Sequence, residues 1–166
     1  MDFKKIIKEI EKSAEFKKWK NENSKAYLAH AFIMTDQQGN GEWQVGYYNP
    51  ENELMTKAII AEGKVDLKCE EVFKKPDSKV GKLNLAKVKI DHPDAGKLAE
   101  ELRKKTYTQE LPLKTIAILQ NIDNYGQVWN MTYFTMKFNT LNIKIDAETG
   151  EVKHHELSQL MKFDKC

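Results

Sequence analysis

The order of secondary-structure patterns repeats along this chain, and the repetition limits its possible folds more than any other feature. An apolar stripe at helical spacing opens each half, and four short apolar or alternating runs follow it. In the first half, a helix is predicted over residues 2–20 and strands over 26–34, 43–48, 54–60 and 65–73. In the second half, a helix is predicted over 93–105 and strands over 113–119, 128–138, 141–146 and 152–157. The sequence therefore predicts an α+β fold of two tandem α-β-β-β-β units, each a helix packed on an antiparallel sheet.

The two predicted helices have clear patterns of their own. Phe3, Ile7 and Ile10 lie on one face of the first, and charged residues fill the rest of its surface. The second begins near Asp91 and Pro93, and an early proline beside acidic residues is typical of helix starts. Each helix is therefore expected to bury one apolar stripe against a sheet.

The two halves also share particular residues. Trp129 follows Trp43 and Tyr133 follows Tyr47 at the same offset of 86 positions, and similar glycine turns near residues 63 and 150 follow at an offset of 87. Chance agreement between two aromatic-rich strands is the alternative. The shared order of elements favours an internal duplication. Its parts are a first repeat over residues 1–75, a polar linker over 76–83 and a second repeat over 84–166.

Two segments of the second half stand out, residues 85–99 and the hairpin 143–152, in which Asp146 and Thr149 can bond the turn backbone and Gly150 can take a positive φ. Together these two segments resemble the PepSY domain family. The resemblance covers about residues 84–160 directly and 1–75 as a degenerate copy. It implies a cystatin-like fold, with each helix packed across a curved antiparallel sheet. It also implies the role of an inhibitory or regulatory module, of the kind attached to proteases or found at the cell envelope.

Composition excludes several classes of partner and location. The chain has 27 Lys and Arg against 25 Asp and Glu, and a net charge of +2 indicates neither a nucleic-acid nor a membrane-surface partner. No apolar run reaches the length of about 18 residues that a membrane helix needs, so no membrane insertion is expected. The chain as given is expected to be soluble and cytoplasmic. If an export signal has been removed from its start, it belongs to the cell envelope or is secreted.

The residues that usually carry catalysis or bind metals are sparse. His154 and His155 are adjacent on a strand and point to opposite faces, and His30 alternates with apolar neighbours, which favours a hydrogen-bonded, half-buried histidine over a general base. Cys69 is expected to be a small buried core residue, and both it and Cys166 are expected to be free thiols. We therefore predict no catalytic residues, no metal and no cofactor.

Four aromatic residues are the candidate binding residues. Trp43, Tyr47, Trp129 and Tyr133 occupy one face of equivalent strands. Such stripes are usually core beneath a helix, and Trp129 is expected to be an anchor near Leu98 in the second helix. The alternative is a concave aromatic surface that binds a peptide or a small apolar ligand, because Trp and Tyr combine apolar area with a polar group.

Two functions remain open from the sequence. The first is a non-catalytic binding or regulatory module, inhibitory in the PepSY sense, with a protein or peptide partner. The second is a small ligand carrier or enzyme with a pocket between helix and sheet. A closed core that buries Trp43 and Trp129 would favour the first, and a pocket of at least roughly 300 Å³ that holds His30 would favour the second.

Overall fold

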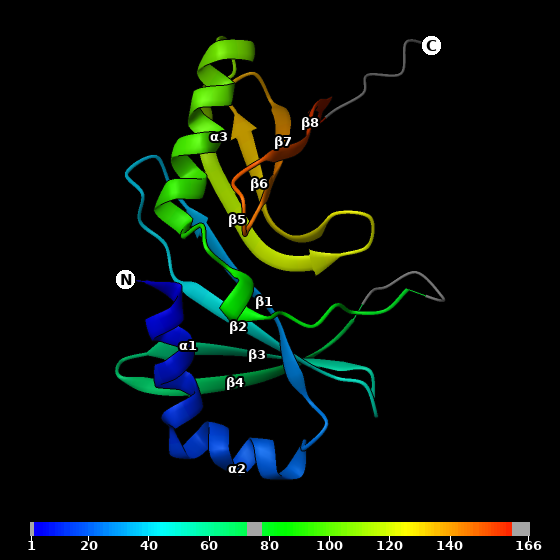
Figure 1. Cartoon of the computed structure of the whole chain (residues 1–166). Helices are drawn as coiled ribbons and strands as arrows, with labels where there is room; N and C mark the ends of the chain where they lie inside the picture. Colours follow the sequence, from blue (N-terminus) through cyan, green and yellow to red (C-terminus); the bar gives the residue numbers. More distant parts are fainter. Residues whose placement is uncertain (1, 73–77, 161–166) are drawn as a thin grey trace, which may run out of the picture.

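All eight predicted strands are present, although Phe73, the predicted end of the fourth, lies outside the described residues. Within the described part of the chain they form one antiparallel sheet with three α-helices (Figure 1). The computed structural model describes residues 2–72 and 78–160. In the first half the elements are α1 (Phe3–Lys12), α2 (Ala14–Glu22), β1 (Tyr27–Thr35), β2 (Trp43–Asn49), β3 (Leu54–Ala61) and β4 (Lys64–Glu71). In the second half they are η1 (Leu85–Lys87), α3 (His92–Thr106), β5 (Pro112–Ile122), β6 (Gly126–Thr135), β7 (Asn139–Asp146) and β8 (Val152–Gln159). The predicted α+β class is confirmed.

The two halves share a single sheet. Its strand order is β4-β3-β2-β1-β5-β6-β7-β8, and each neighbouring pair is antiparallel. At the centre, β1 pairs with β5 from His30–Gln120 to Thr35–Thr115. This pairing corrects the expectation of a separate sheet for each half. Hydrophobic periodicity identifies strands but does not show which edges pair, and joining β1 to β5 satisfies the backbone groups of two edges at once.

The first predicted helix is interrupted at Ser13. The backbone of Ser13 is extended, with φ −65° and ψ 150°, and its hydroxyl accepts a hydrogen bond from the Phe16 backbone N–H at 3.1 Å. The same hydroxyl donates to the carbonyl of Ile10 at 2.7 Å. Ser13 therefore ends α1 and caps α2, so one predicted helix is two helices that pack on different strands.

One apolar core lies between the helices and the sheet and is continuous across both halves. α1 contacts β2 and β3, α2 contacts β4, and α3 contacts β6 and β7 (Figure 1). The ring of Phe3 in α1 packs edge-on against Trp129 in β6, with centroids 5.3 Å apart. Trp43 in β2 lies 6.3 Å from Trp129. These aromatic contacts join the first half to the second inside the core.

The turn predicted between the last two strands is confirmed. Asp146 Oδ1 accepts hydrogen bonds from the backbone N–H groups of Glu148 and Thr149, at 2.8 and 2.9 Å. The Thr149 hydroxyl accepts from the N–H of Glu151, and Gly150 has φ +79°. The side chains and the glycine therefore hold the hairpin as the sequence indicates.

The predicted linker over residues 76–83 is described only in part, because residues 76 and 77 lie outside the described residues. At its end, Leu83 is only 4% exposed, and its backbone N–H donates to the carbonyl of Leu28 at 2.9 Å. The hydroxyl of Tyr27 donates to the carbonyl of Val80 at 2.6 Å. The end of the linker is therefore fixed against β1 and contributes to the core.

Candidate functional site

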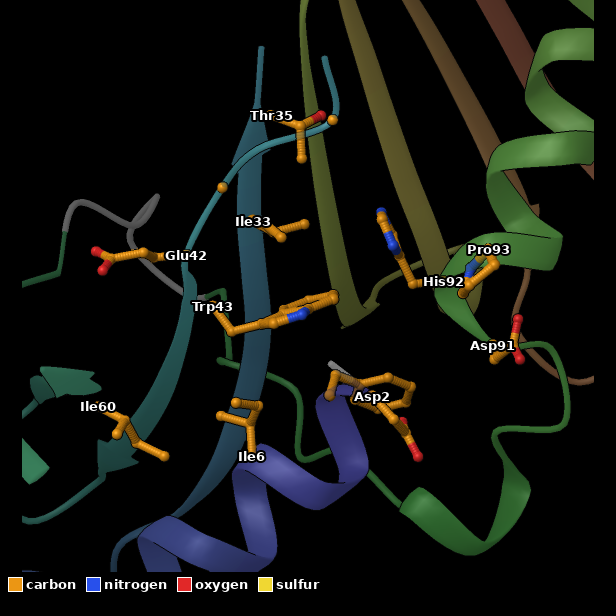
Figure 2. A pocket seen from close by; sticks show the side chains of 13 residues that line it. Asp2, Ile6, Ile33, Thr35, Glu42, Trp43, Ile60, Asp91, His92 and Pro93 are labelled. Carbon is orange, nitrogen blue, oxygen red and sulfur yellow. The ribbon is translucent and has the colours of Figure 1, made fainter. Parts of the chain in front are cut away.

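A cavity of about 500 Å³ opens where the beginnings of α1 and α3 meet the loop between β1 and β2 (Figure 2). Its lining comes from both halves of the chain. Phe3 and Ile6 come from α1, Trp43 from β2, and His92 and Pro93 from α3. The cavity exists because the shared sheet brings the two helix starts together over its central strands.

Two aspartates cap the helices at the cavity. Asp2 Oδ1 accepts a hydrogen bond from the backbone N–H of Lys4 at 3.0 Å, and Asp91 Oδ1 accepts one from Asp94 at 2.9 Å. Carboxylates are favoured at such positions because they satisfy free N–H groups and lie at the positive end of the helix dipole. Local helix chemistry thus places two negative charges in the lining.

His92 forms an aromatic wall with two tryptophans. Its ring lies 5.2 Å from Trp43 and 5.6 Å from Trp129, measured between centroids. In Figure 2 the ring rises from the beginning of α3 and lies beside the indole of Trp43. Burial lowers the pKa of His92, although the neighbouring charge of Asp91 acts in the opposite direction. The imidazole is therefore neutral near pH 7 and contributes as a polar aromatic ring.

The charge of the cavity is negative. Asp2, Asp91 and Glu42 are part of the lining, and no lysine or arginine is among the described residues that line it. Figure 2 shows the Glu42 side chain directed away from Trp43, so the two aspartates matter most for a bound group. The helix dipoles offset only about half a charge each. An apolar wall with excess negative charge suits a group that has both an apolar stem and a positive charge.

The four predicted aromatic residues are core residues, and only Trp43 reaches the cavity. Trp129 is fully buried, and its indole N–H donates to the carbonyl of Ile90 at 2.9 Å. Tyr47 packs under α2, where burial, followed by the charge of Glu11, raises its pKa. Burial also raises the pKa of Tyr133 to about 12. The four rings therefore do not form an open concave surface.

His30 lies away from the cavity. It alternates with buried Ala31 in β1, so it projects from the opposite face of the sheet, beside Gly46 of β2. Burial, followed by the charge of Lys57, lowers the pKa of His30 to about 4. The observation that would have favoured a carrier or enzyme, a pocket that holds His30, is therefore not met, because the cavity contains His92 instead. The sequence did contain a signal for His92, because it lies between Asp91 and Pro93 at a predicted helix start.

The remaining predicted residues have separate environments. His154 lies 3.6 Å from Glu156, whereas His155 contacts Tyr107, so the two histidines do not converge on one site. Among residues 2–72 and 78–160 there is no group of three side chains that could hold a metal ion.

The two cysteines differ in what the structure says of them. Cys69 is exposed, so its predicted burial was wrong, because the far end of edge strand β4 is left open to solvent. Cys166 lies outside the described residues.

Comparisons with known proteins give one similarity of fold. No helix in the described part of the chain is long and apolar enough to cross a membrane. No family model matches the sequence, and no curated protein matches it significantly. Among solved structures, the chain is similar to a predicted lipoprotein from Clostridium difficile 630, with a TM-score of 0.55. The two are 16% identical, over 87% of this chain and 90% of the other, and at this identity the similarity shows the fold alone.

Proposed function

We propose that this protein is a non-catalytic binding module with a regulatory or inhibitory role. In this proposal its cavity receives a lysine or arginine side chain from a protein or peptide partner. The observation that carries the proposal is the lining of the cavity, which combines Phe3 and Trp43 with the carboxylates of Asp2 and Asp91. The aromatic rings would contact the aliphatic stem, and the carboxylates would attract the terminal charge.

A binding experiment with model compounds tests the proposal. We expect blocked lysine amide and blocked arginine amide to shift the NMR signals of Trp43 and His92, and blocked norleucine amide, which lacks the charge, to bind more weakly. Asp91→Asn should weaken the binding of blocked lysine amide, because asparagine keeps the helix cap but removes the negative charge. Asp94→Asn is the matched control, since Asp94 follows in the same helix turn but does not line the cavity. Equal binding of norleucine and lysine would contradict a charged ligand.

The volume of the cavity favours a second candidate, a carrier of a small ligand. About 500 Å³ lies within the range of small-molecule sites, which begins at roughly 300 Å³. The same experiment separates the two candidates. Tight binding of the uncharged norleucine compound, unaffected by Asp91→Asn, would favour the carrier.

We infer further that the two halves are PepSY-like repeats, over residues 1–75 and 84–166. If two repeats are related by a two-fold axis through the central β1–β5 ladder, the facing residues nearest that axis occupy equivalent positions in the two repeats. Phe32 pairs with Ile118, and these residues are separated by the same 86 positions as Trp43 and Trp129. A solved relative with clear sequence similarity to both halves would test the duplication.

We propose the cell envelope as the location. The solved protein of similar fold is a predicted lipoprotein, which supports this location for a chain of the same architecture. Fractionation of the native host with an antibody to this chain tests it. Recovery in the cytosolic fraction would contradict it.

A further inference from the structure

The exposed apolar side chains of this protein gather at one end of the sheet. Seven large hydrophobic side chains are exposed among residues 2–72 and 78–160. Five of them lie where β5 begins, β6 ends and β8 ends, and we call these five the apolar end: Leu111, Leu113, Met136, Phe138 and Leu160. An exposed apolar cluster of this kind usually marks an interaction site.

Backbone hydrogen bonds hold the parts of the apolar end together. The N–H of Met136 donates to the carbonyl of Leu111 at 2.8 Å, and the N–H of Leu160 donates to the carbonyl of Phe138 at 3.1 Å. Met136 and Phe138 are the most exposed of the five, at 54% and 67%. In Figure 1 the turn between β6 and β7 and the last turn of α3 lie at the same extremity of the molecule.

The backbone of Phe138 is strained. It has φ 59°, in the left-handed region that glycine and asparagine tolerate but bulky side chains rarely adopt. A residue that is both strained and exposed does not contribute to folding through burial. The position instead presents an aromatic ring to an external partner.

Lysines surround the apolar end. Lys104 and Lys105 are exposed at the end of α3, Lys114 is exposed in β5, and Lys137 is exposed in the turn itself. The carboxylate of Glu110 is buried and accepts hydrogen bonds from Thr135 and Asn139, so it is not exposed at the surface beside these lysines. Glu156 in β8 is exposed and lies 3.6 Å from His154. In α3, Glu101 is exposed, whereas Glu100 pairs with Arg103. The four exposed lysines thus outnumber the two exposed carboxylates, Glu101 and Glu156, around the apolar end.

We propose that the apolar end docks on an anionic membrane surface. The five apolar side chains would enter the headgroup region, and the four lysines would contact lipid phosphates. A second copy of this chain does not fit, because it would bring lysines against lysines. A projecting ring such as Phe138 also suits a deformable surface better than a protein partner, which would need a matching hollow.

Vesicle sedimentation tests the proposal with the full chain. We expect binding to vesicles of phosphatidylcholine mixed with phosphatidylglycerol, weaker binding as salt increases, and little binding to phosphatidylcholine alone. Phe138→Asn should reduce this binding by about tenfold or more. The same variant should keep or raise the melting temperature, because asparagine accepts a positive φ, so lost binding would not result from unfolding.

The matched control is Glu62→Asn in the turn between β3 and β4. Glu62 also has a positive φ, of 51°, but it lies outside the apolar end, so its substitution should not weaken vesicle binding. Asp91→Asn should likewise not weaken it, which separates this proposal from the proposed role of the cavity. If the wild type binds neither vesicle at low salt, or if Phe138→Asn binds like the wild type, the membrane proposal is overturned. If the wild type binds neither vesicle, an acidic protein becomes the better candidate partner for the apolar end.

Discussion

His30 shows how one residue on the face of the sheet opposite the helices can affect stability. Its ring lies against Gly46, and a Cβ atom at Gly46 would lie 2.1 Å from Cε1 of that ring. The glycine therefore makes room for the imidazole between neighbouring strands. Burial and the charge of Lys57 keep His30 neutral, whereas the charge of Glu70 acts weakly in the other direction.

We expect His30 to destabilise the protein in acid. Its pKa falls from 6.5 to about 4 on folding, so the unfolded chain binds more protons between these values. The contribution is complete above pH 6.5 and is lost as the pH falls through about 4, at a cost of about 3 kcal/mol. Urea unfolding at pH 7 and pH 4 should show a smaller difference in His30→Gln than in the wild type. Equal differences in the two proteins would contradict this.

Trp129 is the residue whose role the sequence predicted best. It was expected to anchor the second helix near Leu98, and it is fully buried. Its ring also packs with the rings of Phe3, Trp43 and His92, and the first two come from the first half. Alternation along a strand predicts the face on which a residue lies. It cannot predict contacts that depend on how two halves meet.

We expect Trp129→Ala to cost about 3–5 kcal/mol of unfolding free energy, as truncation of a buried aromatic residue usually does. The substitution also leaves the carbonyl of Ile90 without its indole donor. The midpoint of urea unfolding measures the effect, with Phe138→Asn as a control that should not lower it. A midpoint equal to that of the wild type would refute the role of Trp129 as an anchor.

At the scale of elements, the strands were more predictable than the helices or their packing. Apolar and alternating runs separated by turn residues indicated all eight strands, and Asp146, Thr149 and Gly150 indicated the last hairpin. The helix break at Ser13 was missed, because the apolar spacing continues across it. The weak signal was a capping serine two residues before Glu15 in the first turn of α2.

The cavity could be predicted only in its parts. Asp91 and Pro93 indicated a helix start, and Phe3 indicated a buried helix face, but these elements are far apart in the sequence. Only the β1–β5 pairing brings them together, and strand periodicity contains no information about that pairing.

We expect Ser13→Ala to destabilise the protein by about 1 kcal/mol, because α2 loses its cap. Ser13→Asp should retain most of the stability, since a carboxylate accepts the same hydrogen bond from Phe16 and favours a helix start. Thermal unfolding of the two variants at pH 7 tests this. If alanine and aspartate have the same effect, the hydroxyl does not act as a cap.

At the scale of the whole molecule, the shared sheet and core should make the two halves unfold together. β1 and β5 are each central strands, so separating the halves would expose the edges of both. It would also expose Trp129, which is fully buried, and remove its contact with Phe3. Both effects oppose independent unfolding, even though the order of elements suggests two units.

Ile7→Ala tests this cooperativity from within the first half. Ile7 is 1% exposed in α1, and its truncation should cost about 2–5 kcal/mol. If the chain is one cooperative unit, the free energy of opening that hydrogen exchange measures for the most protected amides in β6 and β7 should fall by the same amount. This should hold although these strands belong to the other half. Val65→Ala, at the half-buried edge strand β4, is a control that should produce a smaller but equally shared effect. Exchange in β6 and β7 that stays at the wild-type rate in Ile7→Ala would instead mean that the second half keeps its fold while the first opens.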